Sequence, residues 1–190
     1  MDKAAVFIDG GYFAKILQGF GEPRLNFEDF SNELCKRSNA ERFRTYFYDC
    51  MPYQGDPPTP EEKRRYKDKQ SFITYLSKLP RFEVRLGKLS RFDSICNHCG
   101  SKTREYKQKR VDHLLTVDLV RLSWRGMIQK AILITGDSDY VPAVKEAKDA
   151  GVLVQVYYYR GPNTTIHDEL YALCDDRFKI DQDLINHITV

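Results

Sequence analysis

The sequence predicts an α/β protein of three layers, α/β/α, in which a mainly parallel sheet of about five strands lies between helices. Two short apolar runs, Ala4–Ile8 and Ile132–Ile134, contain no polar residue, as is typical of strands buried on both faces of a parallel sheet. Elsewhere, apolar residues recur with helical spacing, so strands and helices alternate along the chain. A chain of 190 residues is expected to form a single domain.

The first half of the chain supplies two strands and two helices. Val6–Ile8 predicts the first strand, and Asn26 is a suitable N-cap for the helix that follows. Arg42–Tyr48 alternates in the manner of a second strand. After a proline-rich loop, Thr59 marks the start of a long helix that ends at Pro80.

The second half continues the alternation. Phe82–Leu86 predicts the third strand, and residues 87–108 form a small insertion that contains two cysteines. The later elements are a helix over Lys109–Trp124, a strand over Ile132–Ile134, a helix over Tyr140–Ala150, a strand over Val152–Tyr158, a helix over Ile166–Cys174 and a short strand or docking segment over Phe178–Ile180. We therefore expect one domain, residues 1–190, with one insertion.

The composition indicates a globular protein that does not bind a membrane. Hydrophobic residues make up 42% of the chain, and no apolar run approaches the roughly 18 residues of a membrane span. The chain opens directly into a strand, without a signal or transit sequence. Its five cysteines show no disulfide framework, which suits a reducing compartment. We expect a cytoplasmic protein.

Positive charge is concentrated in one part of the chain. The formal net charge is only +3, yet residues 60–110 hold 15 Lys and Arg against 6 Asp and Glu. Aromatic residues are interleaved with these cations, and their rings can stack on unpaired bases. The alternative is a solvated helix face. We favour contact with nucleic acid through Lys63, Arg64, Arg65, Lys67, Arg104, Lys107, Lys109 and Arg110.

Both buried runs end in aspartate. Asp9 follows Ala4–Ile8, and Asp137 and Asp139 follow Ile132–Ile134. Ligands and metals bind at the carboxyl ends of parallel strands, so acids from two strands can meet there. Clustered carboxylates repel one another, and a hard cation such as Mg²⁺ or Mn²⁺ removes this cost. The alternative is that Asp9 is a turn residue and that Asp137 or Asp139 only caps a helix.

Three blocks of sequence resemble the NYN domain family (LabA-like proteins) of the PIN-like nuclease superfamily. They are Val6–Phe13, Lys109–Leu119 and Ile134–Pro142, with a weaker fourth block over Leu170–Phe178. The resemblance covers nearly the whole chain. It implies a metal-dependent ribonuclease in which acids from the first strand, the middle helix and a later strand's turn hold a divalent cation.

Residue by residue, the resemblance places the metal ligands at Asp9, Asp112 and Asp137, with Asp139 as a further catalytic acid and Asp118 as a supporting acid. Asp112 also stands in the first turn of a helix that follows a strand, which places it at the same sheet edge. The alternative is that it only stabilises the helix dipole. Asp118 lies six residues further along, roughly 240° around the helix, so it cannot share the face of Asp112.

Two positions depart from the family pattern. Many relatives have Asn three residues after the first Asp, where this chain has Tyr12. The usual Lys-Gly-Val-Asp has Arg110 in place of its glycine. The first change removes an amide that can orient water or phosphate, and the second adds positive charge beside the site.

Cys96 and Cys99 have the spacing of half a zinc site. Four ligands are needed, and the sequence shows no second pair, so Zn²⁺ would require other cysteines or a second chain. The alternative is a loop that carries two thiols.

The leading hypothesis is an endoribonuclease that depends on Mg²⁺ or Mn²⁺ and cleaves single-stranded or loop RNA with a metal-activated water; DNA is not excluded as a substrate. The second is a nucleic-acid-binding regulatory module with the same fold and little activity. A nucleotide-sugar or phosphatase site is a weaker third, because the chain lacks a Gly-rich nucleotide loop and has no Asp-x-Asp directly after the first strand. The apolar residues Leu184, Ile185 and Ile188 are expected to cover the sheet or to form a homodimer contact.

Overall fold

The computed structural model describes residues 1–95, 99 and 101–189, and for residues 90–95 and 102–109 it describes the backbone alone. Within this part of the chain a single sheet has the strand order β4-β3-β2-β1-β5-β6-β7. The strands are β1 (Asp2–Asp9), β2 (Ala40–Cys50), β3 (Phe82–Ile95), β4 (Lys102–Lys109), β5 (Lys130–Ile134), β6 (Leu153–Tyr158) and β7 (Asp176–Lys179). All neighbours are parallel except β4, which is antiparallel to β3.

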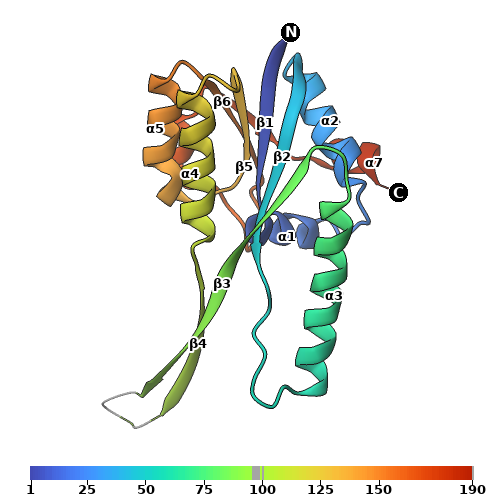
Figure 1. The fold of residues 1–190 in the computed structure, drawn as a ribbon, viewed down its shortest axis with the longest axis vertical. Helices are drawn as coiled ribbons and strands as arrows, with labels where there is room; N and C mark the ends of the chain where they lie inside the picture. The colour runs from blue at the N-terminus through green and yellow to red at the C-terminus, as the bar shows by residue number, and fades with distance from the viewer. Residues whose placement is uncertain (96–98, 100, 190) are drawn as a thin grey trace.

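Helices cover both faces of the sheet (Figure 1), which confirms the predicted three-layer α/β/α class. One face packs against α4 (Val111–Trp124), α5 (Val141–Asp149) and α6 (Asp168–Leu173), and the other against α1 (Gly10–Gly19), α2 (Phe27–Arg37), α3 (Pro60–Ser77) and α7 (Gln182–Ile188). The central strands alternate between the two cores: Phe7 belongs to the first and Ile8 to the second. Leu184, Ile185 and Ile188 of α7 are buried in the second core, so they cover the sheet.

Local sequence explains where the main helices begin. The side chain of Asn26 accepts hydrogen bonds from the first turn of α2, as expected of an N-cap. Thr59 and Glu62 form a reciprocal capping box at the start of α3, with Pro60 as its first residue. No helix in the described residues is both long enough and apolar enough to span a membrane.

The structure contains more strands than the five predicted, and two of its helices, α1 and α7, were not predicted from the sequence. The helix α1 starts at Gly10, directly after β1, where two glycines suggested a turn. Strand β3 continues past Leu86 to Ile95 and pairs with β4, so residues 87–95 and 102–108 of the predicted insertion form most of an antiparallel hairpin. The charged sequence of this segment lacks the apolar periodicity by which the other strands were found.

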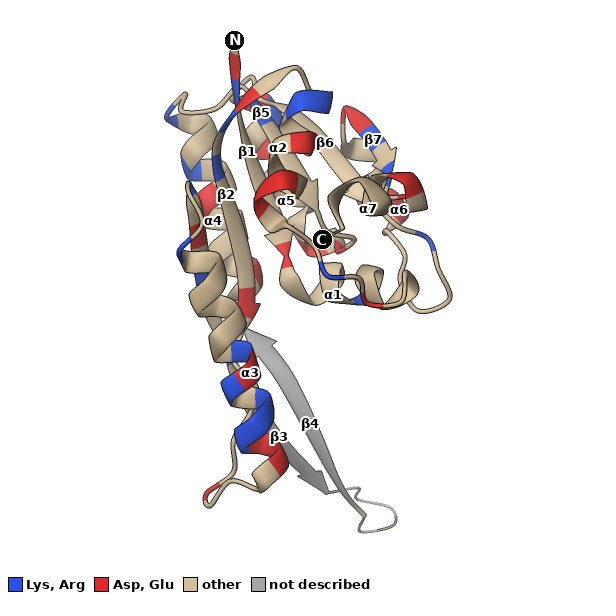
Figure 2. Cartoon of the chain, turned by 90° about the vertical axis from the view of Figure 1, so that its right-hand side faces the viewer, with Lys and Arg blue, Asp and Glu red and all other residues tan. Residues whose placement is uncertain are grey.

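Two parts of the chain extend beyond the body of the domain on the same side. They are the N-terminal half of α3, called here its outer half, and the β3–β4 hairpin, which lie below the central strands β1 and β2 in Figure 1. Lysine and arginine are frequent on the outer half of α3 (Figure 2). The carboxyl ends of β1, β2 and β5 point toward this side, so the predicted acids and the basic helix are at the same end of the molecule.

Candidate active site

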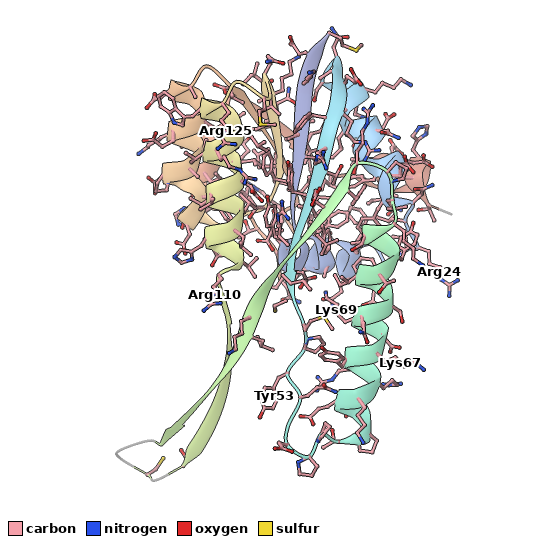
Figure 3. All side chains as sticks on the ribbon, viewed as in Figure 1. Arg24, Tyr53, Lys67, Lys69, Arg110 and Arg125 are labelled. Carbon is pink, nitrogen blue, oxygen red and sulfur yellow. The ribbon has the colours of Figure 1, made fainter. Side chains whose placement is uncertain are left out.

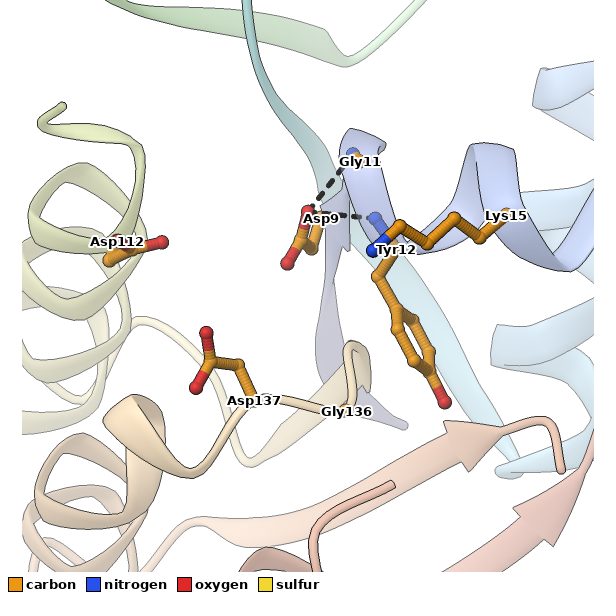
Figure 4. A pocket seen from close by; sticks show the side chains of 7 residues that line it. All are labelled: Asp9, Gly11, Tyr12, Lys15, Asp112, Gly136 and Asp137. Atoms are coloured by element: carbon orange, nitrogen blue, oxygen red, sulfur yellow. Dashed lines mark hydrogen bonds between the residues drawn. The ribbon is translucent and has the colours of Figure 1, made fainter. Parts of the chain in front are cut away.

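Asp9, Asp112 and Asp137 line one cavity of about 450 Å³ at the carboxyl edge of the sheet. Asp9 ends β1, Asp137 follows β5, and Asp112 lies in the first turn of α4. Because β1 and β5 are parallel neighbours, paired at Ile8 and Ile134, their chains leave the sheet side by side. Figure 4 shows the three carboxylates pointing into one space from three different elements. The structure therefore brings the three predicted acids together.

Asp9 is fixed by hydrogen bonds from the start of α1. Its Oδ1 accepts from the backbone N–H groups of Gly11 and Tyr12, at 3.0 and 3.1 Å, and Thr135 Oγ1 lies 3.3 Å from its Oδ2. Burial raises the pKa of Asp9, and the charge of Asp112 adds to this effect, whereas the two N–H groups oppose it. The same carboxylate thus serves as a helix cap and lines the cavity, and its ionised form would be favoured by a cation.

Asp137 is the N-cap of the short 3-10 helix Ser138–Tyr140. Its Oδ1 accepts from the backbone N–H of Asp139 at 2.9 Å, and its own N–H donates to Thr135 Oγ1 at 3.3 Å. The Thr135 hydroxyl therefore forms hydrogen bonds with both Asp9 and Asp137. The sequence allowed either Asp137 or Asp139 to cap a helix, and the hydrogen bond from the N–H of Asp139 shows that Asp137 supplies the cap. Asp139 is exposed and does not line the cavity.

Asp112 is held by a hydrogen bond from Tyr140. Its buried hydroxyl donates to Asp112 Oδ1 at 3.0 Å. Burial and the negative charges of Asp9 and Asp112 raise the pKa of Tyr140 well above its usual range, so the phenol stays protonated and remains a donor.

Replacement of this phenol tests whether it positions Asp112. On the ribonuclease function that the family resemblance implies, we expect Tyr140→Phe to lower the rate of RNA cleavage about tenfold, because a hydrogen bond to a charged group contributes about 1.5–3 kcal/mol and one carboxylate would lose its orientation. The matched control is Tyr157→Phe, since Tyr157 Oη is buried without a hydrogen-bond partner among the described residues. Equal activity of the two variants would show that the phenol has no positioning role.

The donor set fits a hard cation that keeps part of its water shell. The three acids offer only oxygen ligands, which Mg²⁺ and Mn²⁺ prefer. In the part of the chain that the structure describes, no three His, Cys, Asp or Glu side chains are close enough to bind one ion directly. Mg²⁺ is commonly held through one or two carboxylates and several waters, which is compatible with carboxylates spaced around a cavity of this size.

Asp118 is not brought to the cavity. It is buried, accepts a hydrogen bond from Tyr48 Oη at 3.0 Å, and forms ion pairs with Arg85 at 3.3 Å and Arg121 at 2.5 Å. These contacts connect α4 to β2 and β3. The predicted rotation of about 240° between Asp112 and Asp118 places them on different faces of α4.

Two charged residues at this edge were missed by the sequence analysis. Lys15 of α1 is the one cation among the described residues that line the cavity, and Figure 4 shows its side chain directed back along α1. Asp49, near the end of β2, is buried, and its carboxylate pairs with Lys69 and accepts from the N–H of Cys50 at 2.7 Å. The rule that identified Asp9, an acid at the carboxyl end of a strand, also applies to Asp49.

The predicted cations divide into described and undescribed groups. Lys63, Arg64, Arg65 and Lys67 are exposed on α3, and Arg110 is exposed immediately before α4. Arg110 has a φ of 75°, in the left-handed region that favours glycine, and it occupies the position where the family pattern has glycine.

The side chains of Arg104, Lys107 and Lys109, and the whole of Cys96, lie outside the described residues. Cys99 Sγ lies 3.1 Å from Ser101 Oγ, and the zinc hypothesis stays a prediction.

Comparison with known proteins agrees with this architecture. The NYN domain family matches residues 3–181, nearly the whole chain. A solved structure of a protein of unknown function from Vibrio parahaemolyticus is similar in fold, with a TM-score of 0.59 and 18% sequence identity over 100% of this chain and 96% of that one. A search of curated proteins gives no match. The family match over nearly the full length and the three-layer, PIN-like fold show that this chain belongs to the NYN domain family.

Proposed function

We propose that this protein is a metal-dependent ribonuclease that hydrolyses RNA phosphodiester bonds. The observation that carries the proposal is that carboxylates from β1, α4 and the turn after β5 line one cavity at the carboxyl edge of the sheet. Membership in a nuclease-like family supports the same reaction class.

The site's own charges support a role for a cation. Asp9 and Asp112 line the same cavity, and, in addition to burial, the negative charge of Asp112 raises the pKa of Asp9, which shows that the two carboxylates repel each other. A divalent cation held by Asp9, Asp112 and Asp137, directly or through water, would remove this repulsion, polarise the phosphodiester and activate the attacking water. Hydrolysis forms a bond from the water oxygen to phosphorus and breaks the bond to the leaving oxygen, which takes up a proton.

Other residues in and around the cavity would prepare it for this reaction. Thr135 and the N–H groups of α1 hold Asp9, and Tyr140 holds Asp112. The positive charge of Lys15 would attract a non-bridging phosphate oxygen. The exposed cations of α3 would attract the rest of the nucleic acid backbone. Single-stranded or loop RNA is the proposed substrate.

The direct test is RNA cleavage with and without metal. Purified protein should cleave single-stranded RNA in Mg²⁺ or Mn²⁺, lose this activity in chelator, and regain it when excess metal is restored. Parallel reactions with single-stranded DNA of the same sequence test the choice of RNA. Cleavage that continues unchanged in chelator would contradict the proposal.

A second candidate is a nucleic-acid-binding module of the same fold with little activity. Two observations favour it. No three acidic, His or Cys side chains among the described residues are close enough to hold an ion directly. In addition, Tyr12 stands where many relatives have Asn, and its hydroxyl is committed to the backbone of Tyr159. RNA binding in chelator, with no product in any divalent metal, would select this candidate.

A further inference from the structure

A groove lies between the outer half of α3, the loop after β2 and strand β3. It consists of two adjoining pockets of about 540 and 240 Å³ that share Pro52, Arg65 and Leu89 in their walls. The first pocket also includes Phe72, Asp68 and Lys69. The combined size falls in the range of sites that bind small, compact ligands, roughly 300–1,000 Å³.

The lining of the groove combines apolar surface with a few charged groups. Pro52, Leu89 and Phe72 offer apolar contacts, and the Lys69 ammonium lies 5.8 Å from the centre of the Phe72 ring while it pairs with Asp49. Arg65 and Asp68, which also line the wall, carry opposite charges, so the four charged side chains of the groove sum to zero. A groove without net charge gives little selection for a phosphate. Its chemistry instead fits a nucleobase. The flat face of a base can stack on apolar groups and on an arginine, and its N–H groups can donate hydrogen bonds to a carboxylate.

The groove is adjacent to the acidic cavity. Asp9 of β1 is the register partner of Tyr48 in β2, so the ends of these strands, separated by about 4.8 Å, leave the sheet together. Asp49, in the groove wall, is so close to Gly10 that a Cβ on that glycine would lie 2.6 Å from Asp49 Oδ2. Gly10 stands directly between Asp9 and Gly11, which both line the acidic cavity. One polynucleotide strand along this edge would therefore pass both sites.

We propose that this groove binds an unstacked base of single-stranded RNA next to the phosphodiester that is cleaved, an inference that rests on the proposed ribonuclease function. The bases of a duplex are paired and stacked, so they cannot enter the groove. The groove thus provides selection for single strands, and the acidic cavity provides the chemistry.

Two residues of α3 give a matched test of this proposal. Arg65 lines the groove, whereas Lys67 lies on another side of the helix with Gln70 and Tyr75, roughly 200° away, and Figure 3 shows it pointing away from the loop after β2. Both are exposed cations, so Arg65→Glu and Lys67→Glu change the net charge equally. Binding of fluorescein-labelled single-stranded RNA, and of the same strand annealed to its complement, is measured by anisotropy in chelator, where no cleavage occurs.

We expect Arg65→Glu to weaken single-strand binding about tenfold more than Lys67→Glu does, since a base contact contributes about a factor of ten or more. Duplex binding should change equally in the two variants. Equal losses for the single strand would mean that α3 acts only through its overall charge, and this would overturn the proposal. The proposal would also be overturned if the parent protein binds no RNA. The groove would then bind another kind of ligand, such as a peptide. A parent protein that binds through Arg65 but cleaves nothing in Mn²⁺ would instead refute the ribonuclease function and leave the base site standing.

Discussion

Asp137→Asn is expected to lower RNA cleavage at least about 100-fold while the fold is retained. The carboxylate lines the acidic cavity, and a catalytic cation contributes several kcal/mol to the transition state, so loss of a ligand charge removes a large part of that stabilisation. Asparagine keeps the side-chain oxygen that accepts from the N–H of Asp139, and Asn is as good an N-cap as Asp. The rate of cleavage in Mn²⁺ and the thermal unfolding midpoint are the two measurements.

The matched control is Asp149→Asn, which makes the same change at an exposed position at the end of α5. It should cleave RNA at the parent rate. An Asp137→Asn protein that is as active as this control would show that the acidic cavity is not the active site.

Gly136→Ala is expected to disable the site through the backbone. A Cβ at this position would collide with the carbonyl oxygen of Thr165 and would lie 2.5 Å from Cε2 of Tyr12. The backbone contact cannot be relieved by a change of rotamer, so the turn that carries Asp137 must move. Overpacking of this kind costs about 1–3 kcal/mol, and a displacement of about 1 Å in a catalytic group can reduce the rate about 100-fold.

Cleavage rate and unfolding midpoint should both fall in this variant. Gly55→Ala is the control, because the nearest atom to its added Cβ is 3.4 Å away, an ordinary contact. If Gly136→Ala has a lower unfolding midpoint but retains full activity, catalysis does not depend on the present position of the turn.

The fold and the central acids were accessible from the sequence because they depend on short, strongly patterned segments. The runs before Asp9 and Asp137 are fully buried, as their lack of polar residues predicted, and their pairing as parallel neighbours brings the two acids to one edge. Asp112 could be placed because the helical stripe of α4 fixes where that helix begins. The placement of the three acids at this edge needed only local periodicity and one rule about strand ends, whereas their expected role as metal ligands came from the resemblance to the NYN family.

The rest of the site depends on contacts between distant segments, which periodicity does not report. The hydrogen bond from Tyr140 to Asp112 joins two helices, and the sequence analysis assigned Tyr140 no role at the site. Lys15 was hidden because α1 was not predicted, since its two leading glycines disfavour a helix while the Asp9 cap stabilises one. The groove beside α3 requires the loop after β2 to converge with the part of β3 that carries Leu89, and neither of these segments has an informative pattern.

Two properties of Arg110 have opposite consequences: its backbone conformation favours glycine, whereas its side chain provides a positive charge. Its left-handed φ of 75° costs a residue with a Cβ about 1–2 kcal/mol, a cost that glycine does not carry. Arginine retains a fixed positive charge two residues before Asp112 and immediately after β4. If the position were optimised for folding alone, glycine would be the better residue. On the proposed function, an anionic substrate would favour arginine, and Arg110 would then exchange conformational stability for recognition.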